Sequence, residues 1–107
     1  MGDAGGVGPE VALKAASRED LRSLASMVLI GDRRVFEEAS RACGLSIEGI
    51  EIKEVCTLEE FQKGKPTASS GRAAFECIKR ALDGCLKGEF DAMVTAPISK
   101  EALRMAG

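Results

Sequence analysis

One short apolar run constrains the fold of this chain more than any other feature. Residues Met27–Ile30 are all apolar, and Gly31 and Asp32 follow them directly. Because such a run has no polar face, it predicts a strand that is covered on both sides. Strands of this kind belong to parallel sheets, whose connections place helices on the two faces of the sheet. The run therefore favours an α/β fold.

Helical and strand patterns alternate along the rest of the chain, which supports the same fold class. Strands are predicted over 27–30, 50–55 and 90–95, and the second of them partly alternates, as expected nearer a sheet edge. Between residues 56 and 68 the pattern dissolves, apart from one expected turn over 58–61. Helices are predicted over 9–16, 17–24, 33–43, 70–86 and 100–106. Two of them have an apolar stripe: Val35, Phe36, Ala39 and Ala42 or Cys43 on the helix over 33–43, and Ala74, Ile78, Ala81, Leu82 and Cys85 on the helix over 70–86.

Capping residues mark several of these helix ends. Ser17, with Asp20 at the capping-box distance, is expected to begin the short second helix. Asp32 is expected to cap the helix over 33–43, and Gly44 to end it. Ser99 is expected to cap the last helix.

Length and charge exclude several classes of protein. The chain has 107 residues and a net charge of −2, with interspersed signs and no basic patch, so a nucleic-acid partner is not expected. No apolar run approaches the roughly 20 residues of a membrane span, and no signal peptide is visible. The sequence predicts one small domain in the cytoplasm.

The cysteine and histidine counts limit the chemistry further. The four cysteines, at 43, 56, 77 and 85, form no C-x-x-C pair and match no zinc pattern. Buried thiols are therefore expected, with Cys77 and Cys85 on or near the apolar side of one helix. The chain has no histidine, so it supplies neither an imidazole base nor an imidazole metal ligand.

A glycine-dense segment, Met1–Glu10, runs directly into the first predicted helix. Such a segment leaves N–H groups at a helix N-terminus, where anions bind, but it also has the chemistry of a plain tight turn. Its spacing excludes a Walker-type phosphate loop and the dinucleotide G-x-G-x-x-G pattern.

Five residues are candidates for a substrate or phosphate cleft: Asp3, Gly5, Gly6, Thr95 and Lys100. Asp3 either lines the cleft or caps its own turn. Thr95 and Lys100 flank the end of a predicted strand, where α/β proteins place ligand groups, although solvated lysines are the default. Asp32 lies at the end of a predicted strand, 24 residues after Gly8, as a ribose-binding acid would. Because the glycine spacing differs from the dinucleotide pattern, Asp32 is instead interpreted as a helix cap. Lys63, Lys65, Arg33 and Arg34 are expected to be solvated surface residues.

Several stretches resemble the 4-hydroxythreonine-4-phosphate dehydrogenase (PdxA) family. Gly2–Glu10 is similar to its G-D-P-A-G-[IV]-G-P-E opening, and Val28–Asp32 to its second strand. Gly64–Ala74 resembles the entry into its long helix. Asp83–Leu103 contains a version of its A-[IV]-[VI]-T-A-P-I-[NS]-K-E-A-L segment. The motifs occur in the family's order and cover almost the whole chain.

The chain departs from the family pattern at three places. Ala4–Gly5 replaces the family's Pro-Ala, which loosens the turn. The family's strand before the loop is missing, and its G-H-T-E segment would follow Gly107. The expectation is a single incomplete α/β domain over residues 1–107, the amino-terminal third of a PdxA-like protein.

The resemblance implies a partial isocitrate/isopropylmalate dehydrogenase-like fold. It also implies an NAD- and divalent-metal-dependent oxidation and decarboxylation of 4-phosphohydroxythreonine in pyridoxal phosphate biosynthesis, by a homodimer. The family's metal-binding histidines and later substrate ligands lie beyond Gly107. No catalytic or metal-binding residue is therefore assigned here, and the cofactor-binding residues are unknown. Neither NAD nor metal is expected to be fully bound by this chain, which is expected to be inactive alone.

Other functions stay open at the level of sequence. A close branch of the family oxidises phosphorylated threonate, and this segment does not separate the two substrates. A module that binds a phosphorylated ligand without chemistry is a second possibility. The third is an assembly element that folds only against other chains, because missing strands leave sheet edges open.

Overall fold

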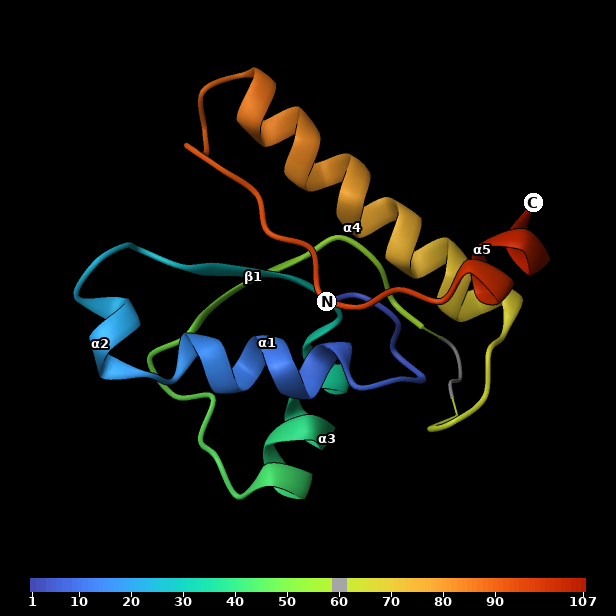
Figure 1. The fold of residues 1–107 in the computed structure, drawn as a ribbon, viewed down its shortest axis with the longest axis horizontal. Helices are drawn as coiled ribbons and strands as arrows, with labels where there is room; N and C mark the ends of the chain where they lie inside the picture. Colours follow the sequence, from blue (N-terminus) through green and yellow to red (C-terminus); the bar gives the residue numbers. More distant parts are fainter. Residues whose placement is uncertain (59–61) are drawn as a thin grey trace.

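The computed structural model describes residues 1–58 and 62–107. Helices surround a small parallel sheet, as the alternating sequence pattern predicts (Figure 1). Within the described residues the elements are α1 (Gly8–Ala16), α2 (Glu19–Arg22), β1 (Val28–Gly31), α3 (Arg33–Cys43), β2 (Glu51–Glu54), α4 (Ala68–Leu86) and α5 (Lys100–Ala106).

The sheet consists of β1 and β2, joined by a crossover through α3. The strands run parallel, in a register that pairs Val28 with Glu51 and Gly31 with Glu54. In β1, Val28, Leu29 and Ile30 are half-buried and Gly31 is buried, whereas the alternating strand β2 carries exposed glutamates at both ends. The fold is α/β with a parallel sheet, as predicted.

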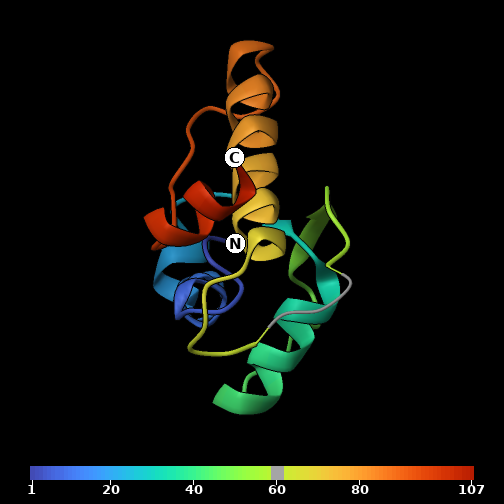
Figure 2. The same ribbon diagram turned by 90° about the vertical axis from the view of Figure 1, so that its right-hand side faces the viewer.

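Helices pack against β1 from different sides. Figure 1 shows β1 between α4 and α1, and Figure 2, turned by 90°, shows α4 rising away from the layer that contains α3. One core cluster lies between these elements and brings distant segments together. Its buried members are Ala4, Val35, Leu58 and Ala73, with Met1 and Cys56 packed against them.

Most predicted helix ends are confirmed. The side chain of Asp32 accepts a hydrogen bond from the Arg34 N–H at 2.9 Å, and Gly44 ends α3 with a left-handed φ of +67°. Ser99 caps α5 by accepting from the Ala102 N–H at 3.1 Å. Helix α4 begins two residues earlier than predicted because Thr67 and Ser70 form a reciprocal capping box.

The predicted cap at Ser17 is wrong. The Ser17 hydroxyl donates to the Leu13 carbonyl at 2.8 Å, so it serves the end of α1 and does not begin α2. The Leu13 carbonyl also accepts from the Ser17 N–H at 3.0 Å, so the hydroxyl adds a second, i to i−4 bond at the end of the helix. Helix α2 begins after Arg18, which makes no side-chain cap, and it ends at Arg22, before the predicted Leu24.

The predicted strand over 90–95 is also wrong. These residues form no described strand, and Val94 is 96% exposed. A strand pattern becomes a strand only with a hydrogen-bonded neighbour, and the described sheet contains β1 and β2 alone.

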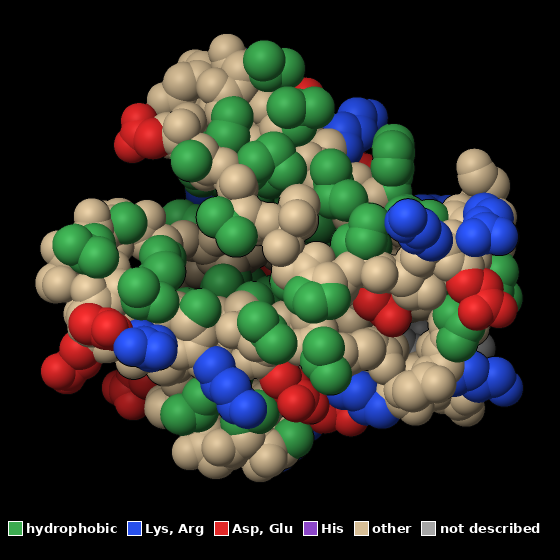
Figure 3. Space-filling view, in the orientation of Figure 1, with side chains coloured by type: hydrophobic (Ala, Val, Ile, Leu, Met, Phe, Trp, Pro, Cys, Tyr) green, Lys and Arg blue, Asp and Glu red, His purple; other side chains and the backbone are tan. Residues whose placement is uncertain are grey.

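The space-filling view shows hydrophobic side chains around a hollow between α4 and the lower part of the molecule (Figure 3).

The predicted apolar stripes hold only in part. On α3, Val35, Phe36 and Ala39 are buried as predicted, and of the two alternatives for the last position Cys43 is half-buried and Ala42 is exposed. On α4, Cys77 is buried as predicted and Cys85 is half-buried, but Leu82 of the predicted stripe is 47% exposed. Of the turn predicted over 58–61, Leu58 is buried and 59–61 lie outside the described residues. No helix among the described residues is both long and apolar enough to cross a membrane.

Candidate functional site

The opening segment folds around the side chain of Asp3. The Asp3 carboxylate accepts a hydrogen bond from the Gly5 N–H at 3.2 Å, and the Gly6 N–H donates to the Asp3 carbonyl at 3.0 Å. These two bonds close an Asx-type turn just before α1. Of the two interpretations of Asp3, the structure contains the turn, and a contact from Asp3 to a ligand stays a prediction.

Residues 62–65 pack against this turn and form a hydrogen bond with it. The Gly64 N–H donates to the Gly5 carbonyl at 2.6 Å. A Cβ atom added at Gly5 would lie 2.7 Å from the Lys65 carbonyl oxygen and 2.8 Å from that of Gln62, so the close backbone approach requires glycine. The segment 62–65 is therefore a lateral support for the opening loop.

Lys63 adds a charged contact to the same support. Its ammonium donates to the Gly6 carbonyl at 3.0 Å and lies 4.0 Å from a carboxylate oxygen of Glu10 on α1. Lys63 is an exposed surface residue, as predicted, and it also makes these two contacts. The sequence gives no signal for the contact, because Lys63 and Gly6 are 57 residues apart.

The opening loop meets the segment that carries the other candidates. The Asp3 N–H donates to the Pro97 carbonyl at 3.0 Å, and this carbonyl also lies beside Gly2 and Gly8. Pro97 is two residues after Thr95 and three before Lys100, so the structure brings the two candidate segments together through the backbone. The side chains of Thr95 and Lys100 stand exposed to solvent, and Lys100 is the first residue of α5. Their contacts with a ligand stay predictions.

This meeting point lies at the carboxyl end of β1. A Cβ atom added at Gly31 would lie within 2.8 Å of Met1 side-chain atoms, so the last residue of the strand touches the start of the opening loop. The carboxyl ends of parallel strands are where open α/β sheets bind ligands. We call the opening loop (residues 1–7) together with residues 95–100 the candidate edge.

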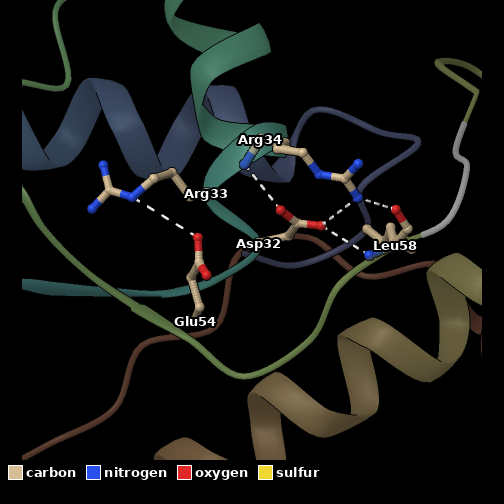
Figure 4. A network of polar contacts seen from close by, with 5 residues as sticks. All are labelled: Asp32, Arg33, Arg34, Glu54 and Leu58. Atoms are coloured by element: carbon tan, nitrogen blue, oxygen red, sulfur yellow. Dashed lines mark hydrogen bonds and ion pairs between the residues drawn. The ribbon is translucent and has the colours of Figure 1, made fainter.

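The buried carboxylate of Asp32 joins three segments beside this edge (Figure 4). Asp32 is 3% exposed, and besides capping α3 it accepts from the Leu58 N–H at 2.8 Å. The Arg34 guanidinium lies 3.4 Å from the same carboxylate and donates to the Leu58 carbonyl. Both Asp32 oxygens are thus used by protein donors, which confirms the helix cap and leaves no free carboxylate oriented toward a ribose.

The two neighbouring arginines have contacts that the sequence does not indicate. Arg34 holds the Leu58 backbone, and Arg33 lies 3.9 Å from a carboxylate oxygen of Glu54 at the end of β2. Both side chains are exposed, as predicted, and each also contacts another segment of the chain. The Arg33–Glu54 pair is half-exposed and contributes little by itself.

Neither a metal-holding group nor a dinucleotide loop of the G-x-G-x-x-G type occurs among the described residues. Among residues 1–58 and 62–107, no three His, Cys, Asp or Glu side chains group so that they could hold a metal ion. The glycine spacing differs from the dinucleotide pattern, and the carboxylate of Asp32 is occupied by the backbone of Arg34 and Leu58. We therefore assign neither group to these residues.

A separate hollow of about 310 Å³ lies at the opposite ends of the strands. Its lining includes Met27, which precedes β1, and Ile50, which precedes β2. Because ligands of open α/β sheets bind at the carboxyl ends of strands, this hollow is the weaker candidate for a ligand site.

The chain matches a known family along most of its length. The family model described as pyridoxal phosphate biosynthetic protein PdxA matches residues 23–107. The 4-hydroxythreonine-4-phosphate dehydrogenase of Trichlorobacter lovleyi is 38% identical over 100% of this chain and 37% of its own length. A protein of Fusobacterium nucleatum with the provisional name D-threonate 4-phosphate dehydrogenase is 36% identical over 97% of this chain and 36% of its own.

Solved structures resemble the whole chain as well. A 4-hydroxythreonine-4-phosphate dehydrogenase from Burkholderia phymatum superposes with a TM-score of 0.88 at 31% identity, covering 100% of this chain and 37% of that one. A terephthalate 1,2-cis-dihydrodiol dehydrogenase from Burkholderia xenovorans gives 0.80 at 32% identity, covering 98% of this chain and 34% of that one. The chain thus spans little more than a third of the proteins that it resembles.

Proposed function

Because the chain belongs to the PdxA family, we propose that it is the amino-terminal part of a dehydrogenase that oxidises 4-hydroxythreonine 4-phosphate in pyridoxal phosphate biosynthesis. The observation that supports this most directly is the candidate edge. The opening loop and residues 95–100 carry two of the motifs that resemble the family, and they meet at the carboxyl end of β1.

The proposed contribution of this chain is to bind and orient the phosphorylated substrate. The Lys100 ammonium and the Thr95 hydroxyl are exposed at the edge, and both are suitable donors to a phosphate or carboxylate oxygen. The opening loop, held by Gln62–Lys65 and by Pro97, forms the fixed wall beside them. The chain would thus provide charge and shape, and it supplies no histidine for proton transfer.

The proposal includes NAD, a divalent metal and a second copy of the complete protein. No group of side chains among the described residues could hold a metal, and no NAD-binding residue is assigned in them, so in this proposal both are held mainly by parts of the family sequence that this chain does not span. The second substrate candidate is D-threonate 4-phosphate, because several relatives of 31–36% identity carry that provisional name. Both substrates are phosphate esters, so the proposed role of the candidate edge is the same.

A chimera tests this proposal. In it, the present chain replaces the matching segment of the Trichlorobacter lovleyi dehydrogenase. With 4-hydroxythreonine 4-phosphate, a divalent metal and NAD, the chimera is expected to produce NADH, and the isolated chain is expected to produce none. Parallel assays with D-threonate 4-phosphate rank the two substrates by kcat/KM.

The parent dehydrogenase is the positive control, and circular dichroism establishes that the chimera is folded. The proposal would be contradicted if the folded chimera produced no NADH with 4-hydroxythreonine 4-phosphate and none with D-threonate 4-phosphate. Turnover by the isolated chain would contradict the part of it that places the cofactor and metal ligands elsewhere.

A further inference from the structure

Two adjacent glycines leave the backbone of the opening loop free to change its conformation. Gly5 and Gly6 lie in the turn just before α1, and neither has a Cβ atom that would restrict its φ and ψ angles. Rotation of the peptide plane that joins Gly6 to Val7 would reverse its carbonyl and its N–H together, because the two groups point in opposite directions in a trans peptide. The loop therefore needs contacts from other segments to keep these planes in one orientation.

Lys63 makes such a contact with the Gly6 carbonyl. Its ammonium donates to this oxygen at 3.0 Å and lies 4.0 Å from a carboxylate oxygen of Glu10, in the first turn of α1. About two thirds of each side chain is covered, since 35% of Lys63 and 31% of Glu10 is exposed. A charged donor makes a stronger hydrogen bond than a neutral one, and the nearby carboxylate favours the ammonium at this position. Lys63 thus joins the loop to the helix that follows it.

The preceding peptide plane, between Gly5 and Gly6, is held by other groups. Its carbonyl accepts from the Gly64 N–H at 2.6 Å, and its N–H donates within the turn at 3.0 Å. In the part of the chain that the structure describes, the plane between Gly6 and Val7 receives its hydrogen bond from Lys63. Loss of the ammonium would therefore release this plane while the preceding one stays held.

We propose that Lys63 is a positioning residue for the candidate edge, an assignment that rests on the function proposed above. The Lys63 ammonium holds the peptide plane after Gly6, and this keeps the opening loop in the shape that meets residues 95–100, where the phosphorylated substrate is proposed to bind. Lys63 acts on the substrate through the loop. Its loss therefore weakens substrate binding and leaves the chemical step unchanged.

Steady-state kinetics of the chimera separate this role from a general loss of structure. Lys63→Met is expected to raise KM for 4-hydroxythreonine 4-phosphate about three- to tenfold, because the lost contact involves a charged but partly exposed donor. The kcat and the KM for NAD should stay within about twofold of the parent chimera. Lys63→Arg keeps a cationic donor and is expected to bring KM back close to the parent value. Lys79→Met removes the same charge from an exposed position on α4 and is the matched control.

Amide NMR of the present chain measures the loop directly and does not depend on turnover. The Gly6 and Val7 amides of the parent are expected to give single narrow signals. In Lys63→Met these signals should shift or broaden by exchange between two orientations of the peptide plane, and Lys63→Arg should restore the parent spectrum. Circular dichroism establishes that each variant is folded.

Three results would overturn the assignment of Lys63. The first is an equal KM for Lys63→Met and Lys79→Met, and the second is an increase of KM for NAD by the same factor as for the phosphorylated substrate. The third is an unchanged pair of loop signals in folded Lys63→Met. A parent chimera without activity would instead contradict the proposed function, and the loop signals would then decide by themselves whether Lys63 holds the loop.

Discussion

Asp32 shows how much of the local structure depends on one side chain. Asp32 directly follows β1, and its carboxylate caps α3 and accepts from the Leu58 N–H, which lies 26 residues further along the chain. Because Asp32 is 3% exposed, water does not replace these bonds when the side chain is removed. Its removal affects a helix cap and a long-range contact together.

We predict that Asp32→Ala lowers the free energy of unfolding by about 2–4 kcal/mol, the combined effect of a lost cap and a buried N–H left without a partner. Asp32→Asn retains one acceptor oxygen and should cost less. Urea unfolding followed by circular dichroism gives both values. Glu38→Ala, an exposed change on α3, is the control and should stay within about 0.5 kcal/mol of the parent. An Asp32→Ala variant as stable as this control would refute the role of the carboxylate.

Residues that act on near neighbours in sequence are the ones that sequence analysis predicts well. The caps at Asp32 and Ser99 and the αL glycine at 44 depend on bonds within five residues, and all three are confirmed. Ser17 fails because a serine between two helices can serve either helix end, and local pattern does not decide between them. Lys63 and Arg34 find partners 57 and 24 residues away, which no local pattern indicates.

At the scale of elements, the crossing of α4 and α5 depends on one glycine. A Cβ atom added at Gly71 would lie 1.9 Å from the carbonyl oxygen of Ala102, so the first turn of α4 touches the backbone of α5 directly. Intrinsic helix propensity favours alanine over glycine by about 1 kcal/mol in a helix interior. The close approach of the two helices outweighs that preference.

We predict that Gly71→Ala destabilises the chain by about 1–3 kcal/mol, because α5 must move away from α4 to admit the methyl group. Thermal or urea unfolding measures the loss. Lys79→Ala, an exposed substitution in the middle of α4, is the matched control and should change stability by less than about 0.5 kcal/mol. If Gly71→Ala stabilised the chain as helix propensity alone suggests, the direct contact between the helices would be wrong.

The sequence predicts the type of an element well where the element forms its own backbone hydrogen bonds. Helix α4 makes its own backbone bonds and has its own capping box, so its pattern predicts it within two residues. A strand needs a neighbour, which explains why the apolar run of β1 is confirmed and the pattern over 90–95 is not. The burial of α4 is less predictable because Leu82 lies on the predicted stripe but on an exposed part of the surface.

For the whole molecule, the sequence predicts the α/β class, and the resemblance predicts the family to which the chain belongs. It does not predict how the candidate residues come together. The contact between Asp3 and Pro97 joins segments that are 94 residues apart, and Gln62–Lys65 supports the opening loop through backbone contacts. Packing creates the candidate edge, and the motifs by themselves give only its components.

The central claim is that this edge binds a phosphorylated substrate, and the KM of the chimera tests it most directly. If Lys100 contacts the phosphate, Lys100→Gln should raise KM at least about tenfold, since a hydrogen bond to a charged group contributes about 1.5–3 kcal/mol. Lys79→Gln removes the same charge from an exposed position on α4 and should leave KM unchanged. A tenfold increase for Lys100→Gln alone is the predicted result; equal KM values for the chimera and both variants would contradict the account.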